Sequence, residues 1–361
     1  MAELSPLPWH GASRTAIAGL RSRGVHAILL HGPAGTGKFD LALARARDEL
    51  CERSLGRAPA CGTCDSCRLF AAGNHPDLRV VVPDALAWRR PGAGSADEEA
   101  PGAEEEAAPA TGGSSKSRPS REIRIEQVRE LASFASLSTH RGGARVVVLG
   151  PAETLNASAA NALLKGLEEP APASLYLLVT DRIDRCLPTI VSRCSGVRVP
   201  VPPREMALNW LRAQAIPDAE ERLTDAGGAP LAVVRQESRD LEPADRDVLL
   251  ALLRLGPRLS AGEIASRVPR EIPIGGAVAL FQRWGWDYLA YRLAGRIRYH
   301  PRDTAHFEAL SAAGWPVAAA SRWLDRLRDL RAVSTHPLNA RSAVEGALLD
   351  FLESLKGGGL A

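Results

Sequence analysis

The sequence predicts an α/β domain that carries a phosphate-binding loop and is followed by domains made only of helices. Three observations support this prediction. Apolar strand-like runs alternate with helical patterns in residues 1–83 and 121–200. A glycine-rich loop that ends in lysine follows the first of these strands. Beyond residue 200, apolar residues recur at helical spacing and no further strand alternation is found.

Composition excludes several classes of protein. The chain has 361 residues, of which 24% are charged and 45% are hydrophobic, and this balance excludes wholesale disorder and fibrous proteins. No apolar run reaches the roughly 18 residues of a membrane helix, and residues 1–10 lack the apolar stretch of a signal peptide. We therefore expect a cytosolic protein. The net charge of +3 is too small to indicate nucleic-acid binding by itself.

The phosphate-binding loop stands between a predicted buried strand, residues 27–31, and a predicted helix, residues 40–50. Its sequence is Gly-Pro-Ala-Gly-Thr-Gly-Lys, which fits the pattern Gly-x-x-x-x-Gly-Lys. In this pattern the glycines let backbone N–H groups face a polyphosphate, and the lysine reaches the terminal phosphates. The candidate nucleotide-binding residues are therefore Gly32, Gly35, Gly37 and Lys38.

Two elements that ATP hydrolysis needs are missing. The position after the loop lysine, normally a Ser or Thr that binds Mg²⁺, is Phe39. The strand predicted at residues 145–149 should end in acidic residues, yet Gly150 and Pro151 follow it, and Glu153 lies farther on. Without these groups a transferred phosphoryl group has no metal clamp. We expect the fold of an ATPase without its chemistry, and both weak nucleotide binding and an empty relic loop stay open.

Four cysteines follow the helix after the loop with the spacing Cys-x9-Cys-x2-Cys-x2-Cys. The short spacers are small and polar, and four thiolates suit a closed, tetrahedral Zn²⁺ site without a catalytic position. A cytosolic location argues against disulfides. We predict structural zinc in a module at about residues 51–67, with redox-active Cys-x-x-Cys pairs as the alternative. The ligands would be Cys51, Cys61, Cys64 and Cys67, whereas Cys186 and Cys194 are interpreted as buried thiols.

A segment of about residues 83–120 interrupts the α/β domain. It is rich in Pro, Gly, Ala and Ser, and it contains two acidic clusters, residues 97–99 and 104–106. Such a composition buries too little apolar surface to offset the entropy of ordering. We predict a disordered insertion here, with an acidic binding tail as the alternative interpretation.

Several motifs together resemble one family. They are NALLKGLEEP at residues 161–170, LPTIVSRC at residues 187–194, HPLNAR at residues 336–341, and the cysteines inserted after the phosphate loop. In combination they resemble the clamp-loader subunits of bacterial DNA polymerase III, which are AAA+ proteins, over nearly the whole chain outside the insertion. Gamma/tau members of this family keep a working phosphate loop and an acidic second motif. Phe39 and Gly150 instead resemble the degenerate delta-prime type, which retains Ser-Arg-Cys.

The resemblance implies three domains. An AAA+ type α/β domain would span residues 1–200 and include the zinc module. A small helical lid would span residues 201–242. A helical collar, residues 243–361, would join a five-subunit ring.

The resemblance also implies roles for single residues. Arg193 of the Ser-Arg-Cys motif would be an arginine finger, presented in trans to ATP on a neighbouring gamma/tau subunit. Thr180 matches the family's first sensor of nucleotide. The arginine of the second sensor is replaced by apolar residues around Pro230 and Leu231. This is a third departure from an active ATPase site.

The implied function is that of a pseudo-ATPase subunit that helps place the sliding clamp on primed DNA during replication. Its partners would be the gamma/tau and delta subunits, the clamp, and DNA contacted non-specifically through phosphates. No membrane partner is expected. One alternative is an active gamma/tau-type ATPase that takes its Mg²⁺ ligands elsewhere. The other is a zinc-dependent nucleic-acid-binding protein, although residues 61–67 contain no basic or aromatic residue.

Overall fold

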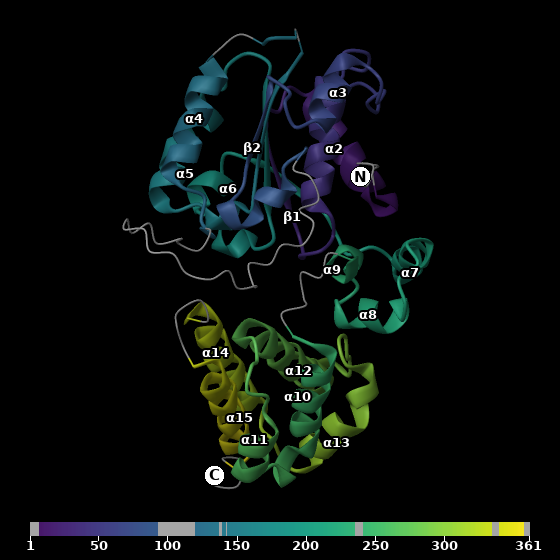
Figure 1. Cartoon of the computed structure of the whole chain (residues 1–361), viewed down its shortest axis with the longest axis vertical. Coiled ribbons are helices and arrows are strands. Elements are labelled where there is room, and N and C mark those ends of the chain that lie inside the picture. Colours follow the sequence, from purple (N-terminus) through teal and green to yellow (C-terminus); the bar gives the residue numbers. More distant parts are fainter. Residues whose placement is uncertain are drawn as a thin grey trace, which may run out of the picture. The chain divides into compact units, whose positions relative to one another are not determined.

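The chain separates into two compact units, Met1–Met206 and Ala207–Ala361, in the computed structural model (Figure 1). The division falls within helix α7 (Arg204–Ala213), just beyond the predicted end of the α/β domain at residue 200. The division of the remainder into lid and collar stays a prediction. The structure describes residues 7–92, 120–136, 139–141, 143–234, 241–333 and 339–356.

The first unit is built on a five-stranded sheet in which all neighbouring strands are parallel. The strand order is β2-β3-β4-β1-β5, so the first strand of the sequence lies inside the sheet. The strands predicted from the sequence at residues 27–31 and 145–149 have these same bounds in the structure. The strands are β1 (Ala27–His31), β2 (Leu78–Val81), β3 (Arg145–Leu149), β4 (Ser174–Thr180) and β5 (Ser195–Arg198).

Helices cover both faces of this sheet (Figure 1). Successive residues of a strand point to opposite faces, so Ile28 and Leu30 join one core, and Ala27 and Leu29 join the other. Three helices pack on the first face, namely α1 (Gly11–Ser22), α2 (Lys38–Leu50) and α3 (Asp65–Ala71). Three pack on the second, namely α4 (Ile125–Ser136), α5 (Ala157–Glu168) and α6 (Pro188–Val191). Burial on both faces explains why the strands read as continuous apolar runs.

The carboxyl ends of the strands place the candidate site. The phosphate loop follows β1, Gly150 follows β3, and Asp181 follows β4. Because the strands are parallel, these three points lie at the same edge of the sheet, where open α/β folds bind their ligands.

The segment predicted as a disordered insertion begins in ordered structure. Residues 83–92 are described, and they include the 3-10 helix η2 (Asp84–Arg89). Leu86 packs against the core on the α2 face, and the guanidinium of Arg89 lies 5.7 Å from the ring centre of Phe39. These contacts explain why the predicted boundary at residue 83 is too early. Both acidic clusters lie in residues 93–119, outside the described residues.

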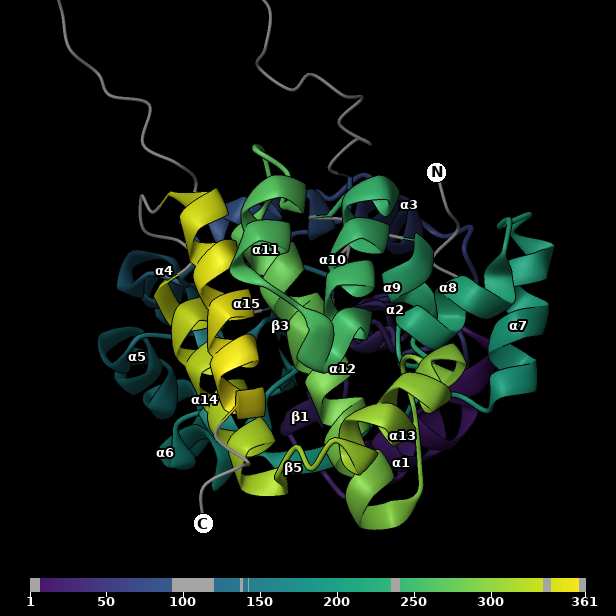
Figure 2. The same ribbon diagram turned by 90° about the horizontal axis from the view of Figure 1, so that it is seen from below.

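The second unit contains only helices among its described residues. Aromatic side chains form its centre, with the ring of Trp284 lying 5.1 Å from Phe307 and 5.6 Å from Phe351. Helices α12, α14 and α15 lie side by side around them (Figure 2). After α7 the helices are α8 (Ala219–Asp225), α9 (Pro230–Val234), α10 (Pro243–Leu255), α11 (Ala261–Arg267), α12 (Ile274–Ala294), α13 (Thr304–Ala312), α14 (Val317–Val333) and α15 (Ala340–Lys356). No helix in the described part of the chain is long and apolar enough to cross a membrane.

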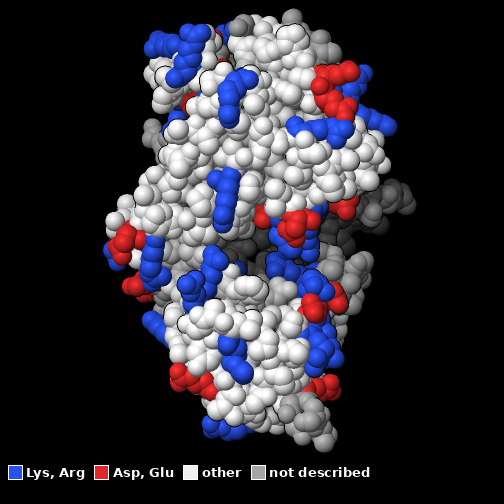
Figure 3. Space-filling model, turned by 180° about the vertical axis from the view of Figure 1, so that it is seen from behind, with Lys and Arg blue, Asp and Glu red and all other residues white. Residues whose placement is uncertain are grey.

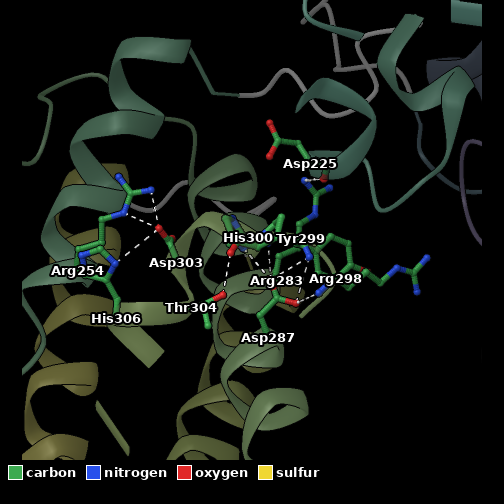
Figure 4. Close-up of polar contacts among 11 residues, drawn as sticks. Asp225, Arg254, Arg283, Asp287, Arg298, Tyr299, His300, Asp303, Thr304 and His306 are labelled. Carbon is green, nitrogen blue, oxygen red and sulfur yellow. Dashed lines mark hydrogen bonds and ion pairs between the residues drawn. The ribbon is translucent and has the colours of Figure 1, made fainter. Parts of the chain in front are cut away.

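A buried carboxylate fixes the turn after α12 (Figure 4). Asp287 is fully buried and accepts hydrogen bonds from the backbone N–H groups of Arg298, Tyr299 and His300 at 2.7–2.9 Å. The guanidinium of Arg298 in turn donates to the carbonyl oxygen of Gly227 at 2.7 Å. A buried charge requires such partners. These bonds hold residues 298–300 against α12 and against the turn that follows α8.

Candidate functional site

The phosphate loop has the backbone shape that its glycines allow. Gly32 has φ +147°, and a Cβ atom there would lie 2.2 Å from the carbonyl oxygen of Val199. Gly35 and Gly37 also have positive φ, 73° and 85°, and Gly37 caps the N-terminus of α2. A larger residue at position 32 would collide with the backbone of the neighbouring chain segment. The loop predicted from the sequence is therefore present, with a strand before it and a helix after it.

Two residues that precede α1 brace this loop, and the sequence did not indicate them. The indole N–H of Trp9 and Nε2 of His10 both donate to the carbonyl oxygen of Thr36, at 2.9 and 3.0 Å. Thr36 is fully buried, and its hydroxyl donates to the carbonyl oxygen of Pro33. Burial lowers the pKa of His10, which favours the neutral ring. The loop is thus held in one shape by side chains of this chain.

Lys38 is buried and forms an ion pair with Asp181. Its side chain is 2% exposed, and Nζ lies 2.6 Å from Oδ1 of Asp181. Nζ also donates to the carbonyl oxygen of Pro33 at 2.5 Å. The ammonium group that would reach a terminal phosphate therefore already has a carboxylate partner from the end of β4. An acidic residue directly after a strand was the signal in the sequence that could have identified Asp181.

The sensor position Thr180 lies beside this pair. Its hydroxyl donates to Oε2 of Glu153 at 2.7 Å, and the backbone N–H of Asp181 donates to Oε1 of the same carboxylate at 3.1 Å. Glu153 lies on the 3-10 helix η3 (Ala152–Thr154). The structure therefore brings Lys38, Asp181, Glu153 and Thr180 into one chain of contacts. Both carboxylate oxygens of Glu153 therefore already accept hydrogen bonds from the protein itself.

The two residues that replace Mg²⁺-binding groups are explained by packing. Phe39 is 5% exposed and belongs to the core between the sheet and α2. Gly150 lies against β4, where a Cβ atom would be 2.9 Å from Cβ of Val179 and 3.1 Å from its carbonyl oxygen. An acidic side chain at position 150 has no room in this arrangement. At the expected second sensor, Pro230 and Leu231 are buried in α9 of the second unit.

The four predicted cysteine ligands converge. Their Sγ atoms all lie within 4.8 Å of one another, and those of Cys51 and Cys64 are 3.9 Å apart. Thiolates at about 2.3 Å from a tetrahedral ion lie about 3.8 Å from each other. The backbone N–H groups of Cys61 and Cys64 donate to Sγ of Cys51 and Cys61 respectively, both at 3.4 Å. These four residues can hold a metal ion, with Cys67 as the fourth ligand.

The charge state of the cluster also suits a cation. Hydrogen bonds from the backbone N–H groups of Thr63 and Cys64 lower the pKa of Cys61 to about 5. Burial raises the pKa of Cys67 to about 12. A bound divalent cation would favour loss of the thiol protons of all four cysteines. Cys186 and Cys194 are not part of it, and burial raises the pKa of both thiols.

Arg193 lies on the α5–α6 side of the unit and contacts no residue of the loop in the described contacts. Its Nε and Nη2 atoms lie 2.5 Å from Oε1 of Glu168, and Nη1 donates to the carbonyl oxygen of Thr189 at 3.0 Å. The Arg193 side chain is 35% exposed and that of Glu168 is 47% exposed. The sequence indicated Arg193 as a candidate functional residue, but it did not indicate its partner Glu168. The guanidinium is therefore anchored by the chain and still accessible from outside.

Comparisons with known proteins identify relatives of this chain. The family described as DNA polymerase III, delta subunit, matches residues 19–202. The DNA polymerase III subunit delta' of Pseudomonas aeruginosa is 35% identical over an alignment of 291 residues, which covers 79% of this chain and 78% of that protein. The DNA polymerase III subunit delta' of Yersinia pestis is 33% identical and covers 73% of this chain and 69% of that protein.

Solved structures give a weaker likeness. A DNA polymerase III gamma subunit-related protein from Thermotoga maritima covers 95% of this chain and 99% of its own, with a TM-score of 0.41 and 16% identity. A likeness at this level adds no argument, so the assignment depends on the sequence relatives. The family match over residues 19–202 and the 35% identity over most of both chains together decide it. The chain therefore belongs to the delta-prime subunit family of DNA polymerase III, a family of clamp-loader subunits.

Proposed function

We propose that this chain is a non-catalytic subunit of the clamp loader, which hydrolyses no ATP itself and acts on the ATP of a neighbour. The observation that carries the proposal is the contrast between two cations. Lys38, which would contact the chain's own nucleotide, is buried against Asp181. Arg193, which would contact a neighbour's nucleotide, is partly exposed.

Arg193 is the proposed arginine finger. A guanidinium offers planar, delocalised positive charge and several N–H donors, which suit the oxygens of a transferring γ-phosphoryl group. Supplied in trans by Arg193, it stabilises the charge that develops on that group in the transition state. A gamma/tau subunit would supply the phosphate loop and Mg²⁺. The present chain would supply one cation and a fixed surface.

The cysteine cluster is proposed to bind structural zinc. Four thiolates close the coordination sphere, so the ion would have no open position for catalysis. Its role would be to fix residues 51–67 against the end of α2, since Cys51 caps that helix and the backbone N–H of Ala60 donates to Asp48 at 2.7 Å. The module would thus be part of the scaffold and not of the reaction.

The helical part of the chain is proposed to act as a lid, residues 201–242, and a collar, residues 243–361. In α12, Trp286 and Leu293 are 56% and 72% exposed although both are large and apolar. They are seven positions apart and thus lie on one face of the helix. Exposed apolar residues that share a face are typical of protein-protein contacts. We assign this face of the proposed collar to a contact with a neighbouring subunit of the ring.

The remaining partners are the delta subunit, the sliding clamp and primed DNA, at the replication fork in the cytoplasm. On the face shown in Figure 3, Lys and Arg side chains are spread out with Asp and Glu side chains among them. Contacts of separate basic side chains with phosphates carry no sequence information and weaken with salt. The proposed binding of DNA is accordingly non-specific and takes place within the assembled complex.

The proposal is tested by ATPase measurements on the purified chain and on the ring assembled with gamma/tau and delta subunits. The chain alone should show no turnover that depends on Lys38. In the ring, Arg193→Ala should slow DNA-stimulated ATP hydrolysis and clamp loading about tenfold or more, because an arginine finger stabilises the transition state. Arg23→Ala, which changes an exposed arginine directly after α1, is the matched control and should leave both rates unchanged. Lys38-dependent turnover by the chain alone, or an unchanged rate with Arg193→Ala, contradicts the proposal.

A further inference from the structure

We infer that Glu168 is a positioning residue for Arg193: it holds the guanidinium in the orientation in which the free N–H groups can meet a neighbour's phosphate. This inference rests on the proposed role of Arg193 as an arginine finger and adds the residue that prepares it. The observation is the double contact of Nε and Nη2 with a single carboxylate oxygen of Glu168.

The contacts of Arg193 involve all three nitrogens of its guanidinium but leave part of its donor capacity unused. The group has five N–H donors in a fixed plane. Those of Nε and one of Nη2 face Glu168, and one of Nη1 donates to the carbonyl oxygen of Thr189. The second N–H of Nη1 makes only a long contact, 3.4 Å, with Oγ of Ser192. The second N–H of Nη2 has no partner among the described residues, and a phosphate can accept it together with the weakly engaged N–H of Nη1.

Glu168 stands on a well-fixed element. It is the last residue of α5, a helix whose N-terminus is capped by Asn156, and the side chain of Asn156 accepts a hydrogen bond from the backbone N–H of Ala159 at 2.8 Å. Leu163 and Leu167 of the helix are each 2% exposed and belong to the core. An anchor on a packed helix restricts the long Arg193 side chain more than a loop residue could. The restriction lowers the entropy that Arg193 would lose on binding a phosphate.

Electrostatics at the end of α5 also favours this arrangement. The C-terminal end of a helix carries partial negative charge, so a carboxylate at this position is unfavourable by itself. A cation placed against Glu168 compensates both the carboxylate and the helix end. Because both side chains are partly exposed, the pair contributes little to folding stability. Its effect should therefore appear in the reaction and not in the free energy of unfolding.

The experiment compares variants in the ring assembled with gamma/tau and delta subunits. Glu168→Ala should lower kcat of the DNA-stimulated ATPase about threefold, less than Arg193→Ala, because Arg193 remains but is no longer oriented. KM for ATP should stay unchanged, since this chain does not bind that nucleotide's base or sugar in the proposed arrangement. Glu168→Gln, which keeps an oxygen acceptor, should recover part of the loss. Glu169→Ala, the exposed next residue, is the matched control and should behave as the parent chain.

The double variant separates positioning from a general structural role. If Glu168 acts through Arg193, then Glu168→Ala has no further effect in a chain that already carries Arg193→Ala. Equal melting temperatures and ring assembly exclude misfolding as the cause. An unchanged kcat with Glu168→Ala, or a further slowing in the Arg193→Ala background, overturns the role of Glu168 while the finger itself stands. No effect of Arg193→Ala overturns the finger, and with it this inference.

Discussion

Lys38 and Arg193 are the two cations of the first unit that the proposed function assigns to nucleotide chemistry, and their surroundings are opposite. Each is paired with a carboxylate of the same chain, Asp181 or Glu168. The Lys38 side chain is 2% exposed, however, and that of Arg193 is 35% exposed. Lys38 also donates to a carbonyl oxygen inside its own loop. Similar ion pairs therefore accompany a buried cation at Lys38 and an accessible cation at Arg193.

The closure at Lys38 has a physical reason. An ammonium group without a partner is costly to bury, and in an active phosphate loop the nucleotide provides the negative charge. Here Asp181 provides it, and its backbone N–H is in turn fixed by Glu153. A nucleotide would have to displace this carboxylate and would meet its negative charge nearby. The Phe39 ring, packed in the core, offers no metal ligand that would help.

Removal of the metal should destabilise α2, the helix that begins at Lys38, more strongly than the surroundings of Arg193. Helix α2 begins at Lys38 and is capped by Cys51, one of the four proposed zinc ligands. Chelation should expose the cluster thiols and lower the free energy of unfolding by an amount on the order of 5 kcal/mol, because the binding energy of a structural metal contributes to folding. Metal analysis, thiol titration and thermal melting measure this. Cys186→Ala is the control and should retain the metal, whereas four freely titratable thiols and no metal in the native chain would contradict the site.

Asp181→Ala should open the closed loop. It leaves the Lys38 ammonium buried without its carboxylate, and we expect a loss of about 2 kcal/mol in the free energy of unfolding, below the value for a fully buried pair because Asp181 is 38% exposed. Pyrophosphate should then raise the melting temperature of this variant and leave that of the parent chain unchanged. Asp184→Ala, which removes an exposed partner of Arg182, is the matched control. A parent chain that pyrophosphate already stabilises would show that Asp181 does not close the loop.

Much of this architecture could be predicted from the sequence, because it depends on local patterns. Continuous apolar runs predicted the strands at residues 27–31 and 145–149, and helical spacing predicted helices beyond residue 200, where α12, α14 and α15 are found. The cysteine spacing predicted a cluster that the structure brings together.

The ion pairs could not be predicted in the same way. Lys38 and Asp181 are far apart in the sequence, as are Glu168 and Arg193, and only the strand order β2-β3-β4-β1-β5 brings the first pair to one edge. The early boundary at residue 83 has a similar cause. Composition suggested disorder from that point, but it contains no information on the packing of Leu86 against the core.

Acidic pH should weaken the contact between His10 and the phosphate loop. Burial lowers the pKa of His10, and its Nδ1 atom is buried without a hydrogen-bond partner in the described structure. The unfolded chain, in which this ring has an ordinary pKa of about 6.5, therefore binds a proton more readily than the folded chain. The contribution of His10 to stability is complete above that value and declines as the pH falls through it. His10→Gln should flatten this part of the stability profile, and a slope that is unchanged would contradict the role of His10.

Lys38→Met should have the smallest effect and gives the sharpest contrast with Arg193→Ala. The methionine fills a similar volume, and the partner it leaves behind, Asp181, is 38% exposed and can be hydrated. We expect the free energy of unfolding to change by about 1 kcal/mol or less. Because Lys38 is proposed to hold no nucleotide, ATP hydrolysis and clamp loading by the assembled ring should stay within about twofold of the parent rates, as expected for a site without transition-state contacts.

In combination with Asp181→Ala, Lys38→Met should restore the stability lost in the single variant and abolish stabilisation by pyrophosphate, because the buried cation is gone. A ring that loses activity with Lys38→Met as strongly as with Arg193→Ala would instead indicate that this chain uses a nucleotide of its own.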